Sequence, residues 1–231
     1  EKDHAQALKP MGYLASTITG MKEERQRSKH APLFAPAGQS TQLVVGATPD
    51  TDLTVLQLAG NLYKEKRLKR VFYSGYVPVS NDARVPRLST PVVRENRLYQ
   101  SDWLLRFYGF RVEELVDAHR PHLDLELDPK TAYALRHPEL FPVEVNTAPL
   151  ELLLRVPGIG TRSAALIIGG RRRGQVRREH LQRMGVVMKR AQYFLAFAGE
   201  AHALVQRPDL LRTRLIAPRM EHAQQLDLFA A

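Results

Sequence analysis

Residues 153–168 have the sequence LLRVPGIGTRSAALII, in which an apolar run, a Pro-Gly-Ile-Gly turn and a second apolar run follow one another directly. Pro157 and two glycines end one helix and Thr161 begins another, so the pattern predicts two short helices joined by a tight turn. Glycine accepts a positive φ and lets the backbone approach a ligand closely. Because unpaired N–H groups and the helix dipole favour a phosphate at a helix N-terminus, the amides of Gly160, Thr161 and Arg162 are candidate phosphate contacts.

The first helix of this pair is expected to begin just upstream. Asn146 or Thr147 is the candidate N-cap residue, and Pro149 is favoured in the first turn. The pattern remains helical as far as about Ala198, which predicts an all-α unit over residues 143–200.

A degenerate copy of the same stretch follows it. Shifted by 27 positions (185 − 158), LLRVPGIGTRSAALI lies over LQRMGVVMKRAQYF, so that Gly158 meets Gly185 and Arg162 meets Lys189. Val187 replaces the second glycine. Two such hairpins packed together would present two turns to a nucleic-acid backbone, and contacts of this kind read no base sequence.

Basic residues are concentrated in the same region. The chain has a formal net charge of +10, and Glu179 is the single acid between Arg155 and Arg190. A local positive field suits a polyanion, although a solvated charged face is the alternative. The candidate DNA contacts are Pro157, Gly158, Ile159, Gly160, Thr161, Arg162, Arg171, Arg172, Arg173, Gly185, Lys189 and Arg190.

The stretch NTAPLELLLRVPGIGTRSAALII, residues 146–168, resembles the helix-hairpin-helix motif of DNA-binding competence and repair proteins. The resemblance implies binding to duplex DNA without sequence preference. Some members of this group are base-excision glycosylases with a catalytic Asp beyond the hairpin, but no acid lies between Ile159 and Arg178, which argues against a glycosylase. A non-enzymatic module that recruits a partner to DNA is the alternative function.

The first half of the chain has a strand–helix–strand–helix pattern. Leu43–Val45 predict a strand ending at Gly46, Asp50 or Thr51 begins a helix, and Arg70–Ser74 predict a second strand. Helices over residues 94–108 and 112–118 follow. This order indicates an α/β unit with a parallel pair, although two strands are too few for a self-sufficient domain.

GQSTQLVVGATPDTDLTVL resembles the fifth strand of a radical SAM (S-adenosylmethionine) barrel with its following helix, and RLKRVFYSGYVPV resembles the sixth strand. Together with RLYQSDWLLRFYGF, FPVEVN and LLRVPGIG, the resemblance covers roughly residues 1–200 and points to radical SAM proteins of DNA modification or repair that end in a helix-hairpin-helix. It implies S-adenosylmethionine and a 4Fe–4S cluster as cofactors. It also implies that Gln39, Ser40, Gln42 and Gly46 line the S-adenosylmethionine pocket; ordinary interior packing is the alternative for the first three.

The chain contains no cysteine, so it cannot supply the three thiolates that hold the family's cluster. We therefore expect the C-terminal part of such an enzyme, inactive alone, with no catalytic residue assigned. The expected organisation is a partial barrel over residues 1–118 with strands near 42–46 and 70–74, a linker over 119–142, a double helix-hairpin-helix over 143–200, and a helix and tail over 201–231.

Near the C-terminus, Gln225, Leu226, Asp227, Leu228 and Phe229 match the pentapeptide by which bacterial repair and replication proteins dock on the sliding clamp. An extended peptide with Leu and Phe anchors can fill a hydrophobic groove, whereas folding back on its own domain is the alternative. A repair partner of the uracil-DNA-glycosylase type is also expected from the DNA context. The sequence has neither a membrane-length apolar window nor a signal peptide, and a cytoplasmic location is expected.

Three further patterns in the sequence are weaker indications of function. His119 and His122 are expected in a surface loop with no metal, because Pro121 breaks their register. The acids Asp124, Glu126 and Asp128 alternate with leucine as on a half-exposed strand. Finally, the aromatic residues Trp103, Phe107 and Tyr108 are expected to pack in a helix core rather than to stack on bases.

Overall fold

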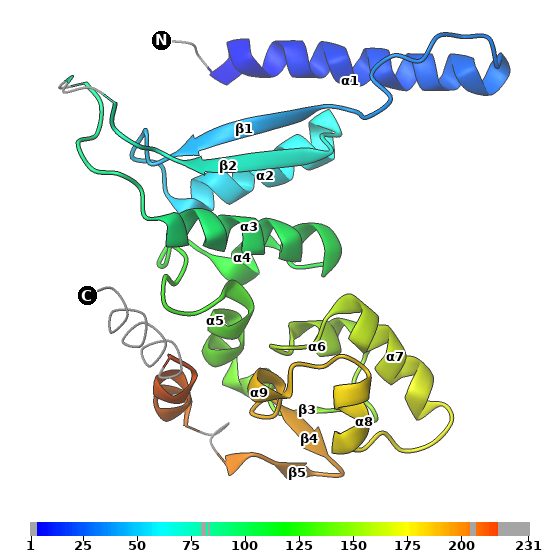
Figure 1. The fold of residues 1–231 in the computed structure, drawn as a ribbon, viewed down its shortest axis with the longest axis vertical. Helices are drawn as coiled ribbons and strands as arrows, with labels where there is room; N and C mark the ends of the chain where they lie inside the picture. Colours follow the sequence, from blue (N-terminus) through cyan, green and yellow to red (C-terminus); the bar gives the residue numbers. More distant parts are fainter. Residues whose placement is uncertain (1–3, 80–81, 83, 204–206, 217–231) are drawn as a thin grey trace, which may run out of the picture. The chain divides into compact units, whose positions relative to one another are not determined.

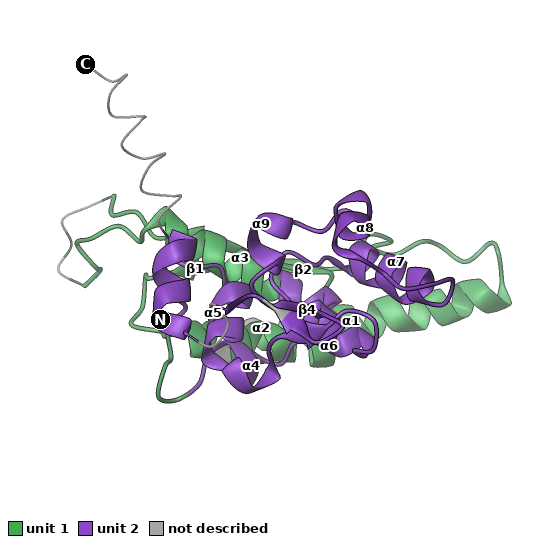
Figure 2. Cartoon of the chain, turned by 90° about the horizontal axis from the view of Figure 1, so that it is seen from below, with its two compact units in different colours: residues 1–102, 118–122 green, residues 103–117, 123–231 purple. Residues whose placement is uncertain are grey.

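The structure is a computed structural model that describes residues 4–79, 82, 84–203 and 207–216. The chain divides into two compact units (Figure 2): unit 1 comprises residues 1–102 and 118–122, and unit 2 comprises residues 103–117 and 123–231. The clamp-docking pentapeptide, residues 225–229, lies outside the described part. No described helix is long and apolar enough to cross a membrane.

Unit 1 combines two parallel strands with long helices (Figure 1). Its elements are α1 His4–Arg27, β1 Ser40–Val45, α2 Asp52–Lys66, β2 Arg70–Gly75 and most of α3 Val92–Phe107. β1 and β2 pair in parallel, from Ser40 opposite Arg70 to Val45 opposite Gly75. The predicted strand–helix–strand–helix order and the parallel pair are therefore confirmed.

One face of the strand pair is buried and the other is open. Val45, Val71 and Tyr73 are each at most 2% exposed, whereas Val44 is 51% and Phe72 39% exposed. Successive side chains of a strand point to opposite faces, so the apolar run at the end of β1 cannot be buried throughout. The open face is unusual, because parallel sheets are normally covered on both sides.

Side chains close the outer edge of β2. Three of its amides donate to side chains of α2 and α3: Val71 to the Tyr63 hydroxyl at 2.9 Å, Tyr73 to the Tyr99 hydroxyl at 3.0 Å, and Gly75 to the Glu95 carboxylate at 2.8 Å. A further strand cannot pair there because these N–H groups are already satisfied. At the other edge of β1, no strand of the described residues is paired.

Unit 2 is mainly helical. Its elements are α4 Val112–Leu115, α5 Pro129–Arg136, the 3-10 helix η1 Pro138–Leu140, β3 Val143–Glu144, α6 Leu150–Arg155, α7 Thr161–Arg171, α8 Arg178–Arg183, α9 Met188–Ala191, β4 Leu195–Phe197 and β5 Glu200–Ala201. Residues 208–216 form one more helix. β3 runs parallel to β4, and β4 runs antiparallel to β5. The all-α prediction for residues 143–200 is wrong in this respect, and α4 is shorter than the helix predicted over 112–118.

Residues 119–142 were expected to be a linker, but residues 123–142 supply part of the core of unit 2. Leu123, Leu127, Tyr133 and Phe141 are between 4% and 6% exposed. The segment also contains α5. A segment with this many buried side chains stabilises unit 2 through the hydrophobic effect instead of merely connecting two domains.

Asp124, Glu126 and Asp128 do not lie on a strand. The Asp124 carboxylate accepts hydrogen bonds from the amides two and three positions further on, at 2.8 and 2.9 Å, which makes a turn. Asp128 caps α5 by accepting from the Thr131 amide at 3.1 Å. Burial acts to raise the pKa of Asp124, but hydrogen bonds from Arg212 and from the backbone hold it below its usual value. The acids therefore have structural partners, which the alternation with leucine did not reveal.

Candidate nucleic-acid interface

Helices α6 and α7 and the turn between them form the first hairpin of unit 2. α7 begins at Thr161, as predicted. Gly158 has a φ of +87°, a left-handed conformation that favours glycine. Gly160 is instead the N-cap residue of α7, with φ −91° and ψ 170°. Only the first of the two glycines is therefore required by the backbone conformation.

Helices α8 and α9 form a second hairpin at the position of the degenerate copy. Gly185, the equivalent of Gly158, has a φ of +80°. The two turns contact each other: the Val187 amide donates to the Gly158 carbonyl at 2.9 Å. A Cβ on Gly185 would lie 3.5 Å from the Ser163 hydroxyl in the first turn of α7. The start of each second helix is thus packed beside the turn of the other hairpin.

Asn146 joins the hairpins and does not cap α6. The N-cap residue of α6 is Pro149, so the capping role predicted for Asn146 or Thr147 is wrong. The Asn146 side chain instead accepts from the Val176 amide at 2.8 Å and donates to the Val176 carbonyl at 3.1 Å. It therefore ties the segment before the first hairpin to the segment that leads into the second.

Gly158→Ala is expected to destabilise unit 2 by about 2–4 kcal/mol, whereas Gly160→Ala changes its stability by less than about 0.5 kcal/mol. A Cβ on Gly158 would lie 2.6 Å from the Val187 carbonyl oxygen, so the variant adds a backbone clash to left-handed strain. At Gly160 the nearest atom would be the Tyr108 hydroxyl at 3.6 Å, an ordinary contact. Urea denaturation followed by the fluorescence of Trp103, the single tryptophan of the chain, measures both variants. Equal losses in the two would contradict the packing of the turns.

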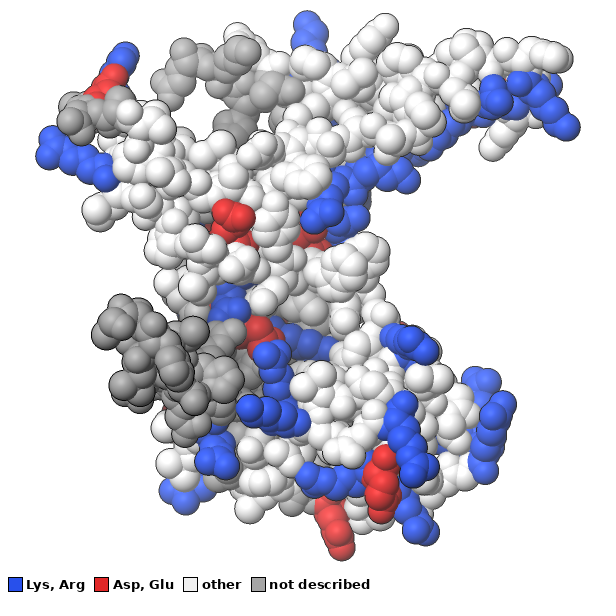
Figure 3. All heavy atoms as spheres, viewed as in Figure 1, with Lys and Arg blue, Asp and Glu red and all other residues white. Residues whose placement is uncertain are grey.

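Five of the predicted DNA-contacting cations have exposed side chains: Arg162, Arg172, Arg173, Lys189 and Arg190. Arg162 and Lys189 occupy equivalent positions, in the first turns of α7 and α9. On the face of unit 2 drawn in Figure 3, Lys and Arg side chains predominate over Asp and Glu. The exposed cations and the first-turn amides of α7, which have no acceptor within the helix, are available to a polyanion.

Other predicted contacts have structural roles. Arg171 is half-buried and donates to the Ala148 carbonyl at 2.6 Å, so its guanidinium fixes the segment before α6. Arg190 lies 3.3 Å from the Asp128 carboxylate, although half of its side chain is exposed. In the turn itself Pro157 and Ile159 are buried, which leaves their backbone and not their side chains beside a ligand.

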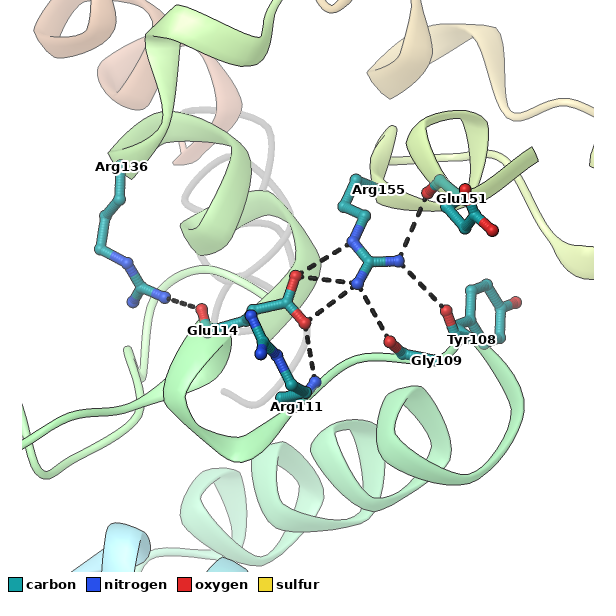
Figure 4. A network of polar contacts seen from close by, with 7 residues as sticks. All are labelled: Tyr108, Gly109, Arg111, Glu114, Arg136, Glu151 and Arg155. Carbon is teal, nitrogen blue, oxygen red and sulfur yellow. Dashed lines mark hydrogen bonds and ion pairs between the residues drawn. The ribbon is translucent and has the colours of Figure 1, made fainter. Parts of the chain in front are cut away.

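Arg155 holds α6 against α4 in a nearly buried network (Figure 4). Its guanidinium contacts both carboxylate oxygens of Glu114, at 2.8 and 2.9 Å, and donates to the Gly109 carbonyl at 3.0 Å. The two side chains are only 13% and 16% exposed. Glu114 in turn accepts from the amide of Arg111 at 2.7 Å. Arg155 therefore belongs to the framework of unit 2 and not to the exposed basic field.

Lys130 supports the first hairpin turn, a role that the sequence did not suggest. Its Nζ donates to the Ile159 carbonyl at 2.6 Å and lies 4.8 Å from the centre of the Tyr108 ring. Burial lowers the pKa of Lys130 to about 7, although the Asp128 carboxylate acts in the opposite direction. Nothing local distinguishes a lysine in the first turn of α5 from an exposed one, because its burial depends on a turn far along the chain.

The stability of unit 2 is expected to rise by roughly 2 kcal/mol between pH 7.5 and pH 9, and Lys130→Met is expected to remove this increase. The pKa of Lys130 is lowered on folding, so the unfolded chain binds more protons than the folded one from about pH 7 up to the ordinary lysine pKa. Unfolding therefore becomes harder as the pH rises through that range. Urea midpoints of both proteins at several pH values measure the effect, and a Lys130→Met protein with an unchanged pH slope would contradict it.

Trp103 and Phe107 are not in the helix core, contrary to prediction. Trp103 is 55% and Phe107 46% exposed, and their ring centres are 4.4 Å apart. Tyr108 alone of the three is half-buried. Four-residue spacing placed the first two on one face of α3 but could not show whether anything covers that face.

The residues expected around S-adenosylmethionine have other partners. Gln39 donates to the Met11 and Lys66 carbonyls at 3.1 and 2.7 Å, and Gln42 donates to the Ser74 hydroxyl at 2.9 Å. A Cβ on Gly46 would lie 2.0 Å from the Thr90 hydroxyl, and Ser40 is exposed at the start of β1. The Gln39 amide therefore has two backbone acceptors within unit 1. Since the chain has no cysteine, the residues present do not fit an iron–sulfur cluster.

No group of three or more His, Asp and Glu side chains in the described ranges is arranged to hold a metal ion. His122 is 59% exposed, with its Nδ1 3.8 Å from an Asp52 carboxylate oxygen.

In comparisons with known proteins, no family model matches the chain, and no curated protein or solved structure matches it significantly.

Proposed function

We propose that unit 2 is a double helix-hairpin-helix module that binds the phosphate backbone of duplex DNA without base-sequence preference. One observation carries this proposal: two packed hairpin turns, each followed by a short helix with an exposed cation in its first turn, Arg162 in α7 and Lys189 in α9. Amides at a helix start and a neighbouring cation together bind a phosphate oxygen well.

Further cations extend the proposed contact along the DNA. Arg172 and Arg173 follow the C-terminal end of α7, which at 11 residues is roughly 16 Å long. Arg177 and Arg183 line a depression at the second hairpin, together with Gln175, Glu179 and His180. Cations spaced in this way can each meet a different phosphate, so binding should depend steeply on salt.

The proposal is tested by measuring the affinity of the whole chain for two short duplexes of unrelated sequence. Backbone contacts predict affinities equal to within about twofold, because phosphates carry no sequence information. A strong preference for one sequence would show that base edges are read and would overturn the proposed mode of binding.

For unit 1, we propose the last two strands of a radical SAM barrel in an enzyme of DNA modification or repair. Two observations support this. Side chains occupy the outer edge of β2, and one face of the strand pair is open, as the inner face of a barrel would be. A further parallel strand would then pair with the free edge of β1. The family's chemistry depends on a cluster that cysteines outside this sequence would have to hold.

This second proposal has a direct test in the gene. A reading frame that continues upstream of Glu1 and encodes a Cys-x3-Cys-x2-Cys loop is the expected finding. A frame without that loop would overturn the enzyme proposal and leave a DNA-binding module that recruits a partner.

A further inference from the structure

Trp103 and Phe107 form an exposed aromatic pair on α3, within unit 2. Their ring planes are inclined by 48° and their centres are 4.4 Å apart, so the two side chains present one continuous surface. About half of each residue is exposed, at 55% and 46%. Two adjacent aromatic side chains exposed to this extent form an apolar surface that a partner can cover.

The surroundings of the pair favour a nucleobase over an apolar protein segment. The Arg106 guanidinium carbon lies 4.8 Å from the centre of the Phe107 ring, so a cation borders the aromatic surface. The same unit carries the exposed cations Arg162, Arg172 and Lys189. Aromatic faces bordered by cations bind unpaired bases, because each base has a π face and each nucleotide carries a phosphate.

Contacts of Tyr108, the residue after the pair, reach the first hairpin turn. Tyr108 directly follows Phe107, and its hydroxyl lies 3.6 Å from the position of a Cβ on Gly160. The Tyr108 ring also lies over the amine of Lys130, which donates to the Ile159 carbonyl in the same turn. A phosphate held at the start of α7 is therefore close to the end of α3 that carries the pair.

We propose that Trp103 and Phe107 stack an unpaired base of the DNA whose backbone the hairpins hold. This inference rests on the proposed duplex binding and adds the substrate class: duplex DNA with a bulged, gapped or flipped-out nucleotide. Stacking is tolerant of base identity, so any of the four bases is accepted.

The single tryptophan makes the test direct, because all tryptophan emission comes from Trp103. The whole chain is titrated with a short duplex containing one bulged nucleotide and with its fully paired counterpart. We expect that only the bulged DNA quenches the emission of Trp103, and that its affinity is roughly tenfold higher than that of paired DNA. DNA affinity is measured separately by the anisotropy of labelled DNA, which does not depend on the tryptophan.

Variants separate stacking from general binding. Trp103→Leu and Phe107→Leu are expected to abolish the tenfold preference while leaving the affinity for paired DNA unchanged. Phe107→Leu keeps the tryptophan, so the loss of quenching is also visible. Leu140→Ala is the matched control, since Leu140 is an exposed apolar residue of the same unit, and it is expected to keep the preference.

The other outcomes show whether the stacking inference or the proposed duplex binding is wrong. Equal affinities and no quenching, with binding to paired DNA intact, would overturn the stacking inference and leave the proposed function standing. The absence of binding to either DNA would overturn both. A Trp103 emission maximum that shifts with protein concentration in the absence of DNA would show that a second copy covers the pair, and the inference would then be wrong.

Discussion

Arg155→Met is expected to lower the free energy of unfolding of unit 2 by about 3–5 kcal/mol. The variant removes a guanidinium that contacts both oxygens of the Glu114 carboxylate and the Gly109 carbonyl, in a site where the two side chains are 13% and 16% exposed. It leaves the carboxylate buried without its main partner, which is the costly part of such a change. Urea denaturation monitored by the emission of Trp103 measures the loss.

Two further variants distinguish the buried pair from a general effect of charge. Arg172→Met removes an exposed guanidinium from the same unit and is expected to change stability by less than about 0.5 kcal/mol. The double variant Arg155→Met with Glu114→Leu removes both charges, and it should recover much of the lost stability. An Arg155→Met protein as stable as the parent would show that the network of Figure 4 does not hold α6 against α4.

The second large effect expected is a loss of affinity for duplex DNA. The double variant Arg162→Gln, Lys189→Gln is expected to lose roughly 50-fold in affinity for duplex DNA at about 0.1 M salt, because each phosphate contact contributes close to one decade there. Each of the two side chains is exposed and lies in the first turn of the second helix of its hairpin. Shortening them therefore removes no contact with the core. Anisotropy of a labelled duplex measures the change.

The matched control removes the same charge from unit 1. Lys22 lies within α1 and Lys29 lies just after it; both are exposed, and replacing both by Gln lowers the net charge equally. We expect this control to reduce the affinity by less than about threefold, since charges away from the DNA act only through a screened field. Equal losses in the two double variants would mean that net charge and not the hairpins determines binding.

The local signals in the sequence were sufficient for the hairpins. Pro157 and Gly158 end one helix for reasons that lie in their own backbones, and the copy shifted by 27 positions has its left-handed glycine at Gly185. The parallel pair in unit 1 was likewise predictable from apolar runs of strand length separated by a capped helix.

The roles of individual charges could not be predicted in the same way. Arg171 and Arg172 are adjacent in one basic run, yet Arg171 donates to the Ala148 carbonyl and Arg172 is exposed. Which of the two faces the solvent depends on where the segment before α6 lies, and this is a tertiary contact. Lys130 is a similar case, because its acceptor is a carbonyl in a distant turn.

The exposed aromatic pair is a feature that the sequence predicted wrongly. An apolar helix face is normally covered, so the spacing of Trp103 and Phe107 indicated a core position. The small sheet of β3, β4 and β5 was missed because its strands are two or three residues long and leave no alternating pattern. Both features depend on how segments distant in sequence meet.

The central claim, that the two hairpins hold DNA by its phosphates, is tested most directly by the salt dependence of duplex affinity. A plot of log affinity against log salt is expected to fall steeply for the parent chain. For the Arg162→Gln, Lys189→Gln variant the slope should be shallower by about two, because each removed cation leaves one phosphate unneutralised. An affinity that does not change with salt, or the same slope in both proteins, would contradict the account.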